Sequence, residues 1–158
     1  MEELTRPEIH YPTPRFDDWF DRCVGAWTSH RRYLMGPKKA IDNLVTDFDI
    51  VKRSHDEWAV LWKSDRNEGE MGLVLRGREL HRSRNYFEGD AGTITTLDRL
   101  DYDTVVFHSN YGGMHYREEI RFLDDNFRLR QTVGRKEDQP YQNTKGIIVV
   151  GQYAEYRL

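Results

Sequence analysis

Apolar side chains recur at helical spacing only near the start of the chain. Successive members of this stripe are three, one, three and one residues apart, which predicts one short amphipathic helix. They are Phe16, Trp19, Phe20, Cys23 and Val24. Thr13 suits the N-cap of this helix, Pro14 suits its first position and Gly25 suits its end.

After Gly25 the pattern changes to short runs with a period of two, separated by turn-forming Gly, Asn and Asp residues. The runs cover residues 27–33, 40–53, 57–64, 70–76, 78–84, 93–98, 103–109, 113–123, 126–135 and 145–157. Antiparallel strands joined by tight turns form a meander, and closing it into a barrel pairs its two edge strands. We therefore predict an all-β fold: a ten-stranded antiparallel barrel with a short N-terminal helix. It is predicted to form one domain over residues 13–158, preceded by a flexible arm over residues 1–12.

Charged and aromatic residues occupy both faces of several predicted strands. Trp27 and Arg31 share one strand face, and Arg128 and Arg130 share another. A barrel interior that is too polar to be filled by hydrocarbon is suited to hold an amphipathic ligand. The arginines would meet the anionic groups of such a ligand, and the tryptophans would meet its flat apolar body.

Composition narrows the classes of function. The chain has 158 residues, 13% of them aromatic, and a formal net charge of −3. The aromatic content argues against disorder, and the acidic balance disfavours a general nucleic-acid binder. Arginine supplies 18 of the 24 basic residues, which reflects either a genomic bias or a need for forked contacts to carboxylates.

The single cysteine, Cys23, excludes an intrachain disulfide and any zinc cluster built from cysteines. It lies on the apolar stripe of the predicted helix, so we expect it to be buried as a small hydrophobic residue rather than to act as a reactive thiol. The N-terminus starts acidic and lacks an apolar run, and no stretch approaches the length of a membrane span. We expect a cytoplasmic protein that binds neither membrane nor metal.

Three other polar patterns are candidate sites. Glu118 and Glu119 are adjacent in a strand and point to opposite faces, so they cannot act as a carboxylate pair on one bond, although either alone is a candidate acid. His108 and His115 can approach across a turn but make an incomplete metal site. The segment 76–84 is the densest basic stretch, with four alternate residues predicted on one face, and it keeps a nucleic-acid-binding barrel open as a minor alternative. Those residues are Arg78, Leu80, Arg82 and Arg84.

The order of six short motifs resembles the S-type phycobiliprotein lyases (the CpcS/CpeS family), and the resemblance spans about residues 16–158. The motifs are Gly25-x-Trp27-x-Ser29-x-Arg31, the strand around Trp62, Arg82-Ser-Arg84-Asn-Tyr86, Glu118-Glu-Ile-Arg-Phe122, Asn126-Phe-Arg-Leu-Arg130 and Tyr153-Ala-Glu-Tyr-Arg157. Three positions depart from the family pattern: His30 stands for Gln, Asn85 for Gly and Arg121 for Trp.

The resemblance implies a lipocalin-like barrel close to the fatty-acid-binding proteins, and a lyase that attaches a linear tetrapyrrole (a bilin) to a cysteine through a thioether bond. The substrate would be phycoerythrobilin or phycocyanobilin, with no other cofactor. The acceptor would be an apo-phycobiliprotein subunit of phycoerythrin or phycocyanin type. A bilin reductase as donor and a homodimer are further expectations. A non-catalytic carrier of a bilin, haem or fatty acid is the alternative.

The resemblance also implies a set of site residues. Glu118 is the catalytic candidate, either hydrogen-bonding pyrrole N–H groups or delivering a proton, and Glu118 and Arg128 match the family's pocket glutamate and arginine. Arginines would clamp the two propionates of the bilin, while Trp27 and Trp62 would stack on its rings. The bilin-binding candidates are Trp27, Arg31, Trp62, Arg82, Arg84, Tyr86, Arg128, Arg130 and Glu155.

Overall fold

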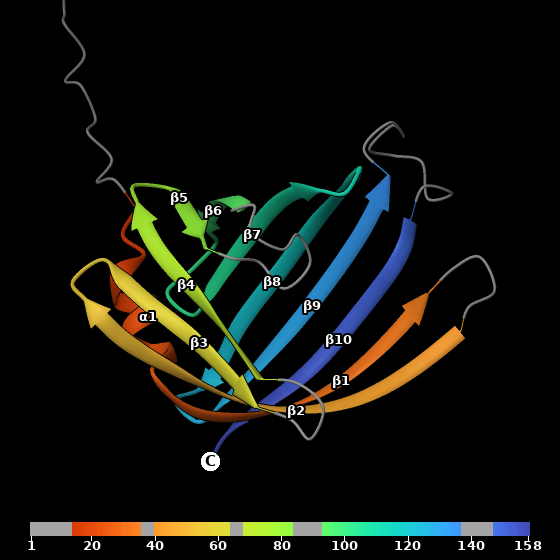
Figure 1. The fold of residues 1–158 in the computed structure, drawn as a ribbon, viewed down its shortest axis with the longest axis horizontal. Coiled ribbons are helices and arrows are strands. Elements are labelled where there is room, and N and C mark those ends of the chain that lie inside the picture. The colour runs from red at the N-terminus through yellow and green to blue at the C-terminus, as the bar shows by residue number, and fades with distance from the viewer. Residues whose placement is uncertain (1–13, 36–39, 64–67, 84–92, 137–146) are drawn as a thin grey trace, which may run out of the picture.

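The computed structural model describes residues 14–35, 40–63, 68–83, 93–136 and 147–158, which form one helix and ten strands (Figure 1). The elements are α1 (Asp17–Cys23), β1 (Gly25–Met35), β2 (Ala40–Ser54), β3 (Glu57–Lys63), β4 (Glu68–Arg76), β5 (Glu79–Arg82), β6 (Thr93–Arg99), β7 (Thr104–Tyr111), β8 (Met114–Asp124), β9 (Phe127–Lys136) and β10 (Ile147–Arg157). The predicted arm over residues 1–12 lies outside the described residues.

Each strand pairs antiparallel with the next one along the chain, and β1 pairs with both β2 and β10. This last pairing closes the barrel, so no strand edge is left unpaired. In register, Trp27 lies opposite Phe48 of β2 and opposite Arg157 of β10. The predicted ten-stranded antiparallel barrel is therefore confirmed.

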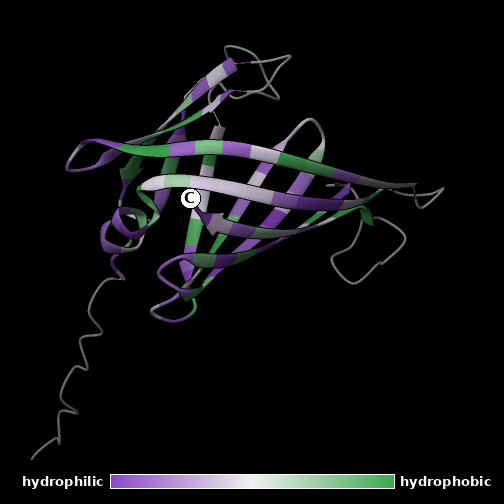
Figure 2. Cartoon of the chain, turned by 90° about the horizontal axis from the view of Figure 1, so that it is seen from below, coloured by the Kyte–Doolittle hydropathy of each residue, from purple (hydrophilic) through white to green (hydrophobic). Residues whose placement is uncertain are grey.

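Successive side chains of a strand point alternately to the lumen and to the outer face. Hydrophilic and hydrophobic residues follow one another along the strands (Figure 2). On β8 the inward set contains Glu118 and Phe122, whereas Glu119 lies outside between Arg117 and Arg121, 3.5 and 3.7 Å from their guanidinium groups. The predicted register of this strand, with Glu118 inside and Glu119 in a row of outer ion pairs, is confirmed.

Helix α1 closes one end of the barrel (Figure 1). Trp19 and Phe20 are buried against Phe107 and Phe122 in edge-on ring contacts. The Trp19 indole also donates a 3.0 Å hydrogen bond to the Asp103 carbonyl in the β6–β7 turn. The turns that follow β2, β4, β6 and β8 lie at this same end of the barrel. The opposite end therefore forms the mouth.

The helix starts later than predicted. It begins at Asp17 with Phe16 as its N-cap and no side-chain cap, and Thr13 lies outside the described residues. Phe16 is buried, so packing rather than capping chemistry sets the helix start. After the helix, Gly25 opens β1 with φ +142°. Glycine is required at this position because of that φ angle, and because the Arg157 guanidinium fills the space that a Cβ atom would need.

Candidate functional site

The polar residues of the lumen gather on the wall formed by β1, β8, β9 and β10, with one further arginine on β5. They belong to inward positions of these strands, where they alternate with outward residues such as His30 and Glu119. The inward charged residues and the tyrosine among them are Arg31, Arg82, Glu118, Arg128, Arg130, Tyr153 and Glu155. The predicted polar interior is thus present.

The deepest of these groups is an ion pair next to α1. Arg128 Nε donates to Glu155 Oε1 at 3.0 Å, and the two side chains are 4% and 0% exposed. A second guanidinium nitrogen of Arg128 donates to the Cys23 sulfur at 3.3 Å. Burial alone would raise the pKa of the Glu155 carboxyl, but the charges of Arg128 and then Arg130 outweigh it and hold the pKa below its ordinary value. The pair is ionised and closed off from solvent.

Trp27 lies in the core beneath this pair. Its indole is fully buried, donates to the Cys23 carbonyl at 2.8 Å, and has the Arg128 and Arg157 guanidinium carbons 4.8 and 4.4 Å from its ring centre. The ring is therefore occupied by protein contacts. This position disagrees with the predicted stacking of Trp27 on a ligand, because an exposed ring face is needed for that role.

A second ion pair lies nearer the mouth. Arg130 Nε donates to Glu118 Oε2 at 2.8 Å, and its Nη2 donates to the same oxygen; the side chains are 24% and 13% exposed. Glu118 therefore pairs with Arg130 and not with Arg128. Burial would raise the pKa of the Glu118 carboxyl, but Arg130 and Arg82 outweigh it and lower that pKa. Glu118 is ionised, which suits a hydrogen-bond acceptor better than a proton donor.

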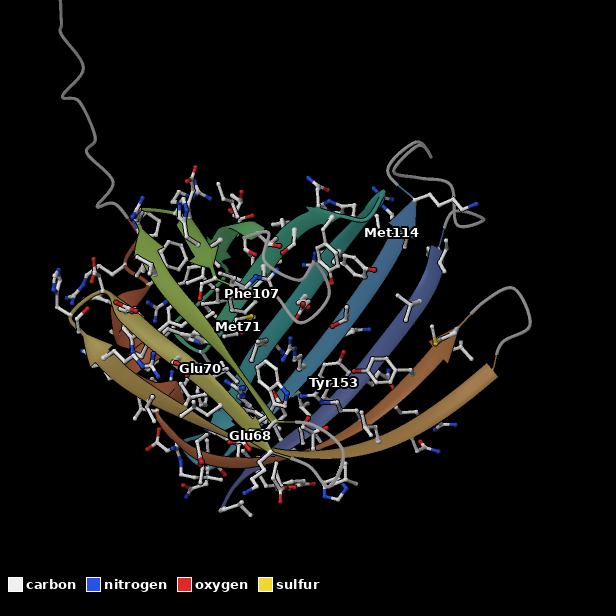
Figure 3. The ribbon with its side chains drawn as sticks, viewed as in Figure 1. Glu68, Glu70, Met71, Phe107, Met114 and Tyr153 are labelled. Atoms are coloured by element: carbon white, nitrogen blue, oxygen red, sulfur yellow. The ribbon has the colours of Figure 1, made fainter. Side chains whose placement is uncertain are left out.

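Two further arginines face the lumen around the second pair. Arg82 donates to the Ser109 hydroxyl at 2.8 Å, and Arg31 Nε donates to the Ser29 hydroxyl at 3.1 Å. Tyr153 lies between Arg31 and Arg130, whose guanidinium carbons are each 5.1 Å from its ring centre (Figure 3). Burial raises the pKa of the Tyr153 phenol, which keeps it protonated as a hydrogen-bond donor.

The described lumen carries an excess of positive charge. Four inward guanidinium groups lie around two inward carboxylates on the described strands between the closed end and the mouth. The groups are Arg31, Arg82, Arg128 and Arg130, with Glu118 and Glu155. Such an interior favours an anionic ligand.

A cavity beside α1 has a volume of about 90 Å³. Its wall is mostly apolar, with Met71 and Phe107 among the lining residues, and includes Glu118 and Arg130 (Figure 3). Pockets for drug-sized ligands measure roughly 300–1,000 Å³, so such a ligand must extend from this cavity towards the mouth. There the inward-facing Leu44 is half exposed and provides apolar wall.

A larger hollow of about 460 Å³ lies on the outer face of β1, β8, β9 and β10. Outward residues such as Arg32, Arg121 and Leu129 form most of its lining. It contains neither of the buried ion pairs in full, and its polar groups face solvent. We assign the candidate site to the lumen because the charged groups with shifted pKa values converge there.

The remaining predicted residues fall into two groups. Trp62 lies on the inner face of β3, half-buried beside the core, whereas Arg84 and Tyr86 lie outside the described residues.

The prediction that Arg78 shares a face with Arg82 is wrong. Arg78 lies in the β4–β5 turn, which Gly77 forms with φ +62°, and it pairs with Asp98 on the outer face.

Tyr153 and Ser109 lie in the site but are not among the residues predicted from the sequence. Tyr153 is two residues from Glu155 and therefore shares its strand face, a signal that was available in the sequence. Ser109 joins Arg82 to the Thr95 hydroxyl through a 2.8 Å hydrogen bond, a contact across three strands that only the register reveals.

Cys23 is fully buried, and burial raises the pKa of its thiol to about 11. Its predicted burial is confirmed. His108 and His115 do stack on the outer face, 5.8 Å apart, but among the described residues no group of three or more candidate ligands could hold a metal ion. Within that same part of the chain, no helix has the length and apolar character to cross a membrane.

The fold is that of a lipocalin-like barrel, and charged groups converge in its lumen. No family model matches the chain. A curated protein from Picosynechococcus sp., "Putative chromophore lyase CpcV", is 24% identical over an alignment 169 positions long. The alignment covers 89% of this chain and 80% of that protein.

Solved structures show the same fold. The S-type phycobiliprotein lyase CpeS from Guillardia theta matches with a TM-score of 0.64 and 20% identity, over 90% of this chain and 92% of that one. A DUF3598 protein of unknown function from Nostoc punctiforme matches with a TM-score of 0.62 and 10% identity, over 87% of this chain and 48% of that one. The resemblance to the S-type lyases inferred from the motifs is confirmed at the level of the fold.

Proposed function

We propose that this chain is a bilin lyase, which binds a linear tetrapyrrole in its lumen and directs its attachment to a cysteine of an apo-phycobiliprotein subunit. The observation that carries the proposal is the set of inward arginines, Arg31, Arg82, Arg128 and Arg130, inside a partly apolar barrel. A bilin has a flat apolar body and two propionates, so it matches this interior in charge and in shape. The likeness to proteins named as lyases supports the same class.

The propionates are proposed to bind at Arg31, Arg82 and Arg130. These guanidinium groups lie around the lumen on the mouth side of the deep ion pair, and the planar fork of a guanidinium group matches a carboxylate. Arg128 contributes mainly to the electrostatic field, because its guanidinium group already contacts Glu155, Cys23 and Trp27.

Glu118 is proposed to accept hydrogen bonds from pyrrole N–H groups. Its carboxylate is ionised and faces the lumen, and a negative charge at that position stabilises a protonated, cationic tetrapyrrole. Arg130 fixes the orientation of the carboxylate through two hydrogen bonds. The protein thus selects one bilin conformation and protonation state, which is where a lyase of this kind contributes to the rate and the product.

The nucleophile is proposed to come from the acceptor subunit, because the one cysteine of this chain is buried and its thiol pKa is raised. The subunit's thiolate adds to the ethylidene group of the bilin, so a C–S bond forms and the exocyclic C=C bond is consumed. The electron pair passes into the conjugated system, which takes up one proton. No oxidant or reductant is required.

Phycoerythrobilin or phycocyanobilin, a subunit of phycoerythrin or phycocyanin type, a reductase that delivers the bilin, a homodimer and a cytoplasmic location complete the proposal. They rest on the motif resemblance and not on a contact in the lumen.

One mixture tests the proposal against the carrier alternative. The chain is incubated with phycocyanobilin or phycoerythrobilin and an apo-phycobiliprotein subunit, and the product is denatured before absorbance is read on a gel. A lyase leaves colour attached to the subunit with a single absorbance maximum, above the level reached without the chain. A carrier changes the bilin spectrum when mixed with it but leaves the subunit product unchanged in yield and heterogeneity.

A further inference from the structure

Three aromatic rings in the lumen lie over glycines of the barrel wall. The pairs are Trp62 over Gly69, Tyr116 over Gly134 and Tyr153 over Gly151. In the first two pairs the ring and the glycine are direct cross-strand partners, between β3 and β4 and between β8 and β9. In the third the glycine precedes the ring by two residues on the inner face of β10.

These glycines are required by space and not by backbone conformation. None of the three has a positive φ, unlike Gly25 and Gly77. A Cβ atom at Gly69 would overlap the Trp62 indole. Three of the atoms around such a Cβ would be ring atoms of that one side chain, so the indole lies across the glycine and not merely near it.

The other two glycines show the same close approach. A Cβ atom at Gly151 would lie 2.9 Å from Cε1 and 3.1 Å from the hydroxyl of Tyr153. One at Gly134 would lie 2.8 Å from Cε1 of Tyr116 and 2.5 Å from a methyl group of Val149. Contacts below 3.0 Å are essentially never seen for a real Cβ, so an alanine would force each ring away from the wall.

A ring that leaves the wall must move into the lumen, because the strand backbone occupies the other side. The cavity beside α1 is already small, at about 90 Å³. Rings held against the wall therefore keep the space near the mouth open. The Tyr153 ring (labelled in Figure 3) also contacts the guanidinium groups of Arg31 and Arg130, so moving this ring would disturb both groups.

We propose that Gly69, Gly134 and Gly151 are specificity-determining residues that let Trp62, Tyr116 and Tyr153 lie close against the wall. The lumen then admits a wide, planar, conjugated dianion. The inference rests on the proposed function, since a bilin is the ligand of that shape, and it assigns to three glycines the selection of a flat ligand over a thin aliphatic chain. Glycine in a strand interior weakens the strand, so a specific need for close approach accounts for its presence.

A purely structural role makes a different prediction. Aromatic side chains often cover cross-strand glycines and stabilise the sheet. In that case an alanine at the glycine changes the stability of the barrel and leaves ligand affinity as it is. The two roles are separated by measuring both quantities on the same variants.

The test is a double-mutant cycle read by titration with biliverdin, a linear tetrapyrrole with two propionates. Gly151→Ala is compared with the wild type, and the same substitution is compared in a Tyr153→Leu background. We expect about a 10-fold loss of biliverdin affinity in the first comparison and less than a 2-fold change in the second, because leucine lacks the ring atoms that clash. Palmitate affinity should fall by less than 2-fold in both.

Gly72→Ala is the matched control. Gly72 lies on the outer face of β4, and its added Cβ would approach the Ser83 hydroxyl to 2.6 Å, so it reproduces a close contact away from the lumen. We expect it to bind biliverdin as the wild type does. Urea unfolding of every variant reports stability separately. Should Gly151→Ala fail to fold, the Gly69→Ala and Trp62→Leu cycle applies the same criterion.

The outcomes are distinct. A wild type that binds no biliverdin overturns the proposed function and this inference with it. Wild-type binding with an unchanged Gly151→Ala affinity, or with equal losses in both backgrounds, overturns only this inference and leaves the glycines a structural role. A loss that disappears when the ring is removed supports the assignment.

Discussion

The lumen contains two arginine–glutamate pairs whose chemistry is the same and whose surroundings differ. Arg128 and Arg130 are two residues apart on β9 and face the same way, yet the Arg128–Glu155 side chains are 4% and 0% exposed and the Arg130–Glu118 side chains are 24% and 13% exposed. The difference in exposure comes from α1, which closes the end of the barrel next to the Arg128–Glu155 pair. A shift of two residues along one strand thus separates a structural pair from one that a ligand can reach.

Substitution of either residue of the Arg128–Glu155 pair is expected to lower the stability of the fold. Its charges have lost their hydration, so each carboxylate or guanidinium depends on its partner. The outer pair retains contact with the lumen and can exchange partners when a ligand with carboxylates and N–H donors enters. The comparison predicts that substitutions in the deep pair act on stability, and that substitutions in the outer pair act on binding.

The largest effect is expected from Glu155→Gln. The amide keeps the shape of the side chain but leaves the Arg128 guanidinium buried without a counter-charge. Removing one member of a buried pair costs about 3–5 kcal/mol of unfolding free energy. Urea denaturation measures it, with the surface substitution Glu119→Gln as control, for which we expect a change below about 0.5 kcal/mol. Equal changes in the two variants would place the Arg128–Glu155 pair among the weak, solvated ion pairs.

Arg130→Lys is expected to act on binding. Lysine keeps the charge but loses the planar fork that spans Glu118 and a ligand carboxylate. Loss of a charge-assisted contact costs about 1.5–3 kcal/mol, roughly a 10- to 150-fold weaker bilin affinity. Bilin titration followed by absorbance measures it. Arg121→Lys on the outer face of β8 is the matched control and should bind as the wild type does. Coincident titration curves for Arg130→Lys and the wild type would remove Arg130 from the site.

The two pairs show which features of the site could be predicted from the sequence and which could not. The period of two placed Glu118 inside and Glu119 outside, because alternation is a local property of every strand. The pairing of Glu118 with Arg130, and of Glu155 with Arg128, could not be predicted. It depends on the register between β8, β9 and β10 and on side-chain rotamers, which no local pattern encodes.

The two tryptophans that the sequence predicts to stack on a ligand differ in how far they are buried. Trp27 and Trp62 both fall on inward positions, and from the sequence both were expected to stack on a ligand. Only the three-dimensional structure shows that the guanidinium groups of Arg128 and Arg157 cover the Trp27 ring, whereas Trp62, two strands away on β3, is only half-buried. The two tryptophans lie in one cross-strand row through Phe48, so the packing around each ring, and not its register, separates them.

A smaller effect is expected from the pH dependence of stability at Glu118. Its pKa in the folded chain lies below the ordinary value of 4.5, so the carboxylate stabilises the fold above about pH 4.5. That contribution is lost as the pH falls through the lowered pKa. The unfolding free energy of Glu118→Gln should therefore decrease less than that of the wild type between pH 7 and acidic pH. Urea unfolding at a series of pH values measures the difference.

Glu119→Gln is the control for this measurement, because the same chemical change is made one residue away on the outer face. It should follow the wild-type pH profile and leave the absorbance of bound bilin unchanged, whereas Glu118→Gln should shift that absorbance. If the two variants exchange these behaviours, the register of β8 is displaced by one residue and the inward assignments from Tyr116 to Phe122 are inverted.

The smallest effect is expected at Cys23, whose side chain contacts the deep pair. Its sulfur accepts from Arg128 and lies 3.4 Å from the Trp19 carbonyl, in a site that the closing helix seals. Cys23→Ala removes these weak contacts and one buried atom, so we expect about 1 kcal/mol of lost stability. Bilin binding and transfer to an acceptor subunit should remain as in the wild type. Because the thiol pKa is raised to about 11, iodoacetamide at pH 8 should leave Cys23 unmodified in the folded chain and alkylate it in urea, as mass spectrometry would show. A variant that binds bilin but cannot pass it on would make Cys23 a covalent carrier of the bilin, and would move the chemistry from the mouth to the closed end of the barrel.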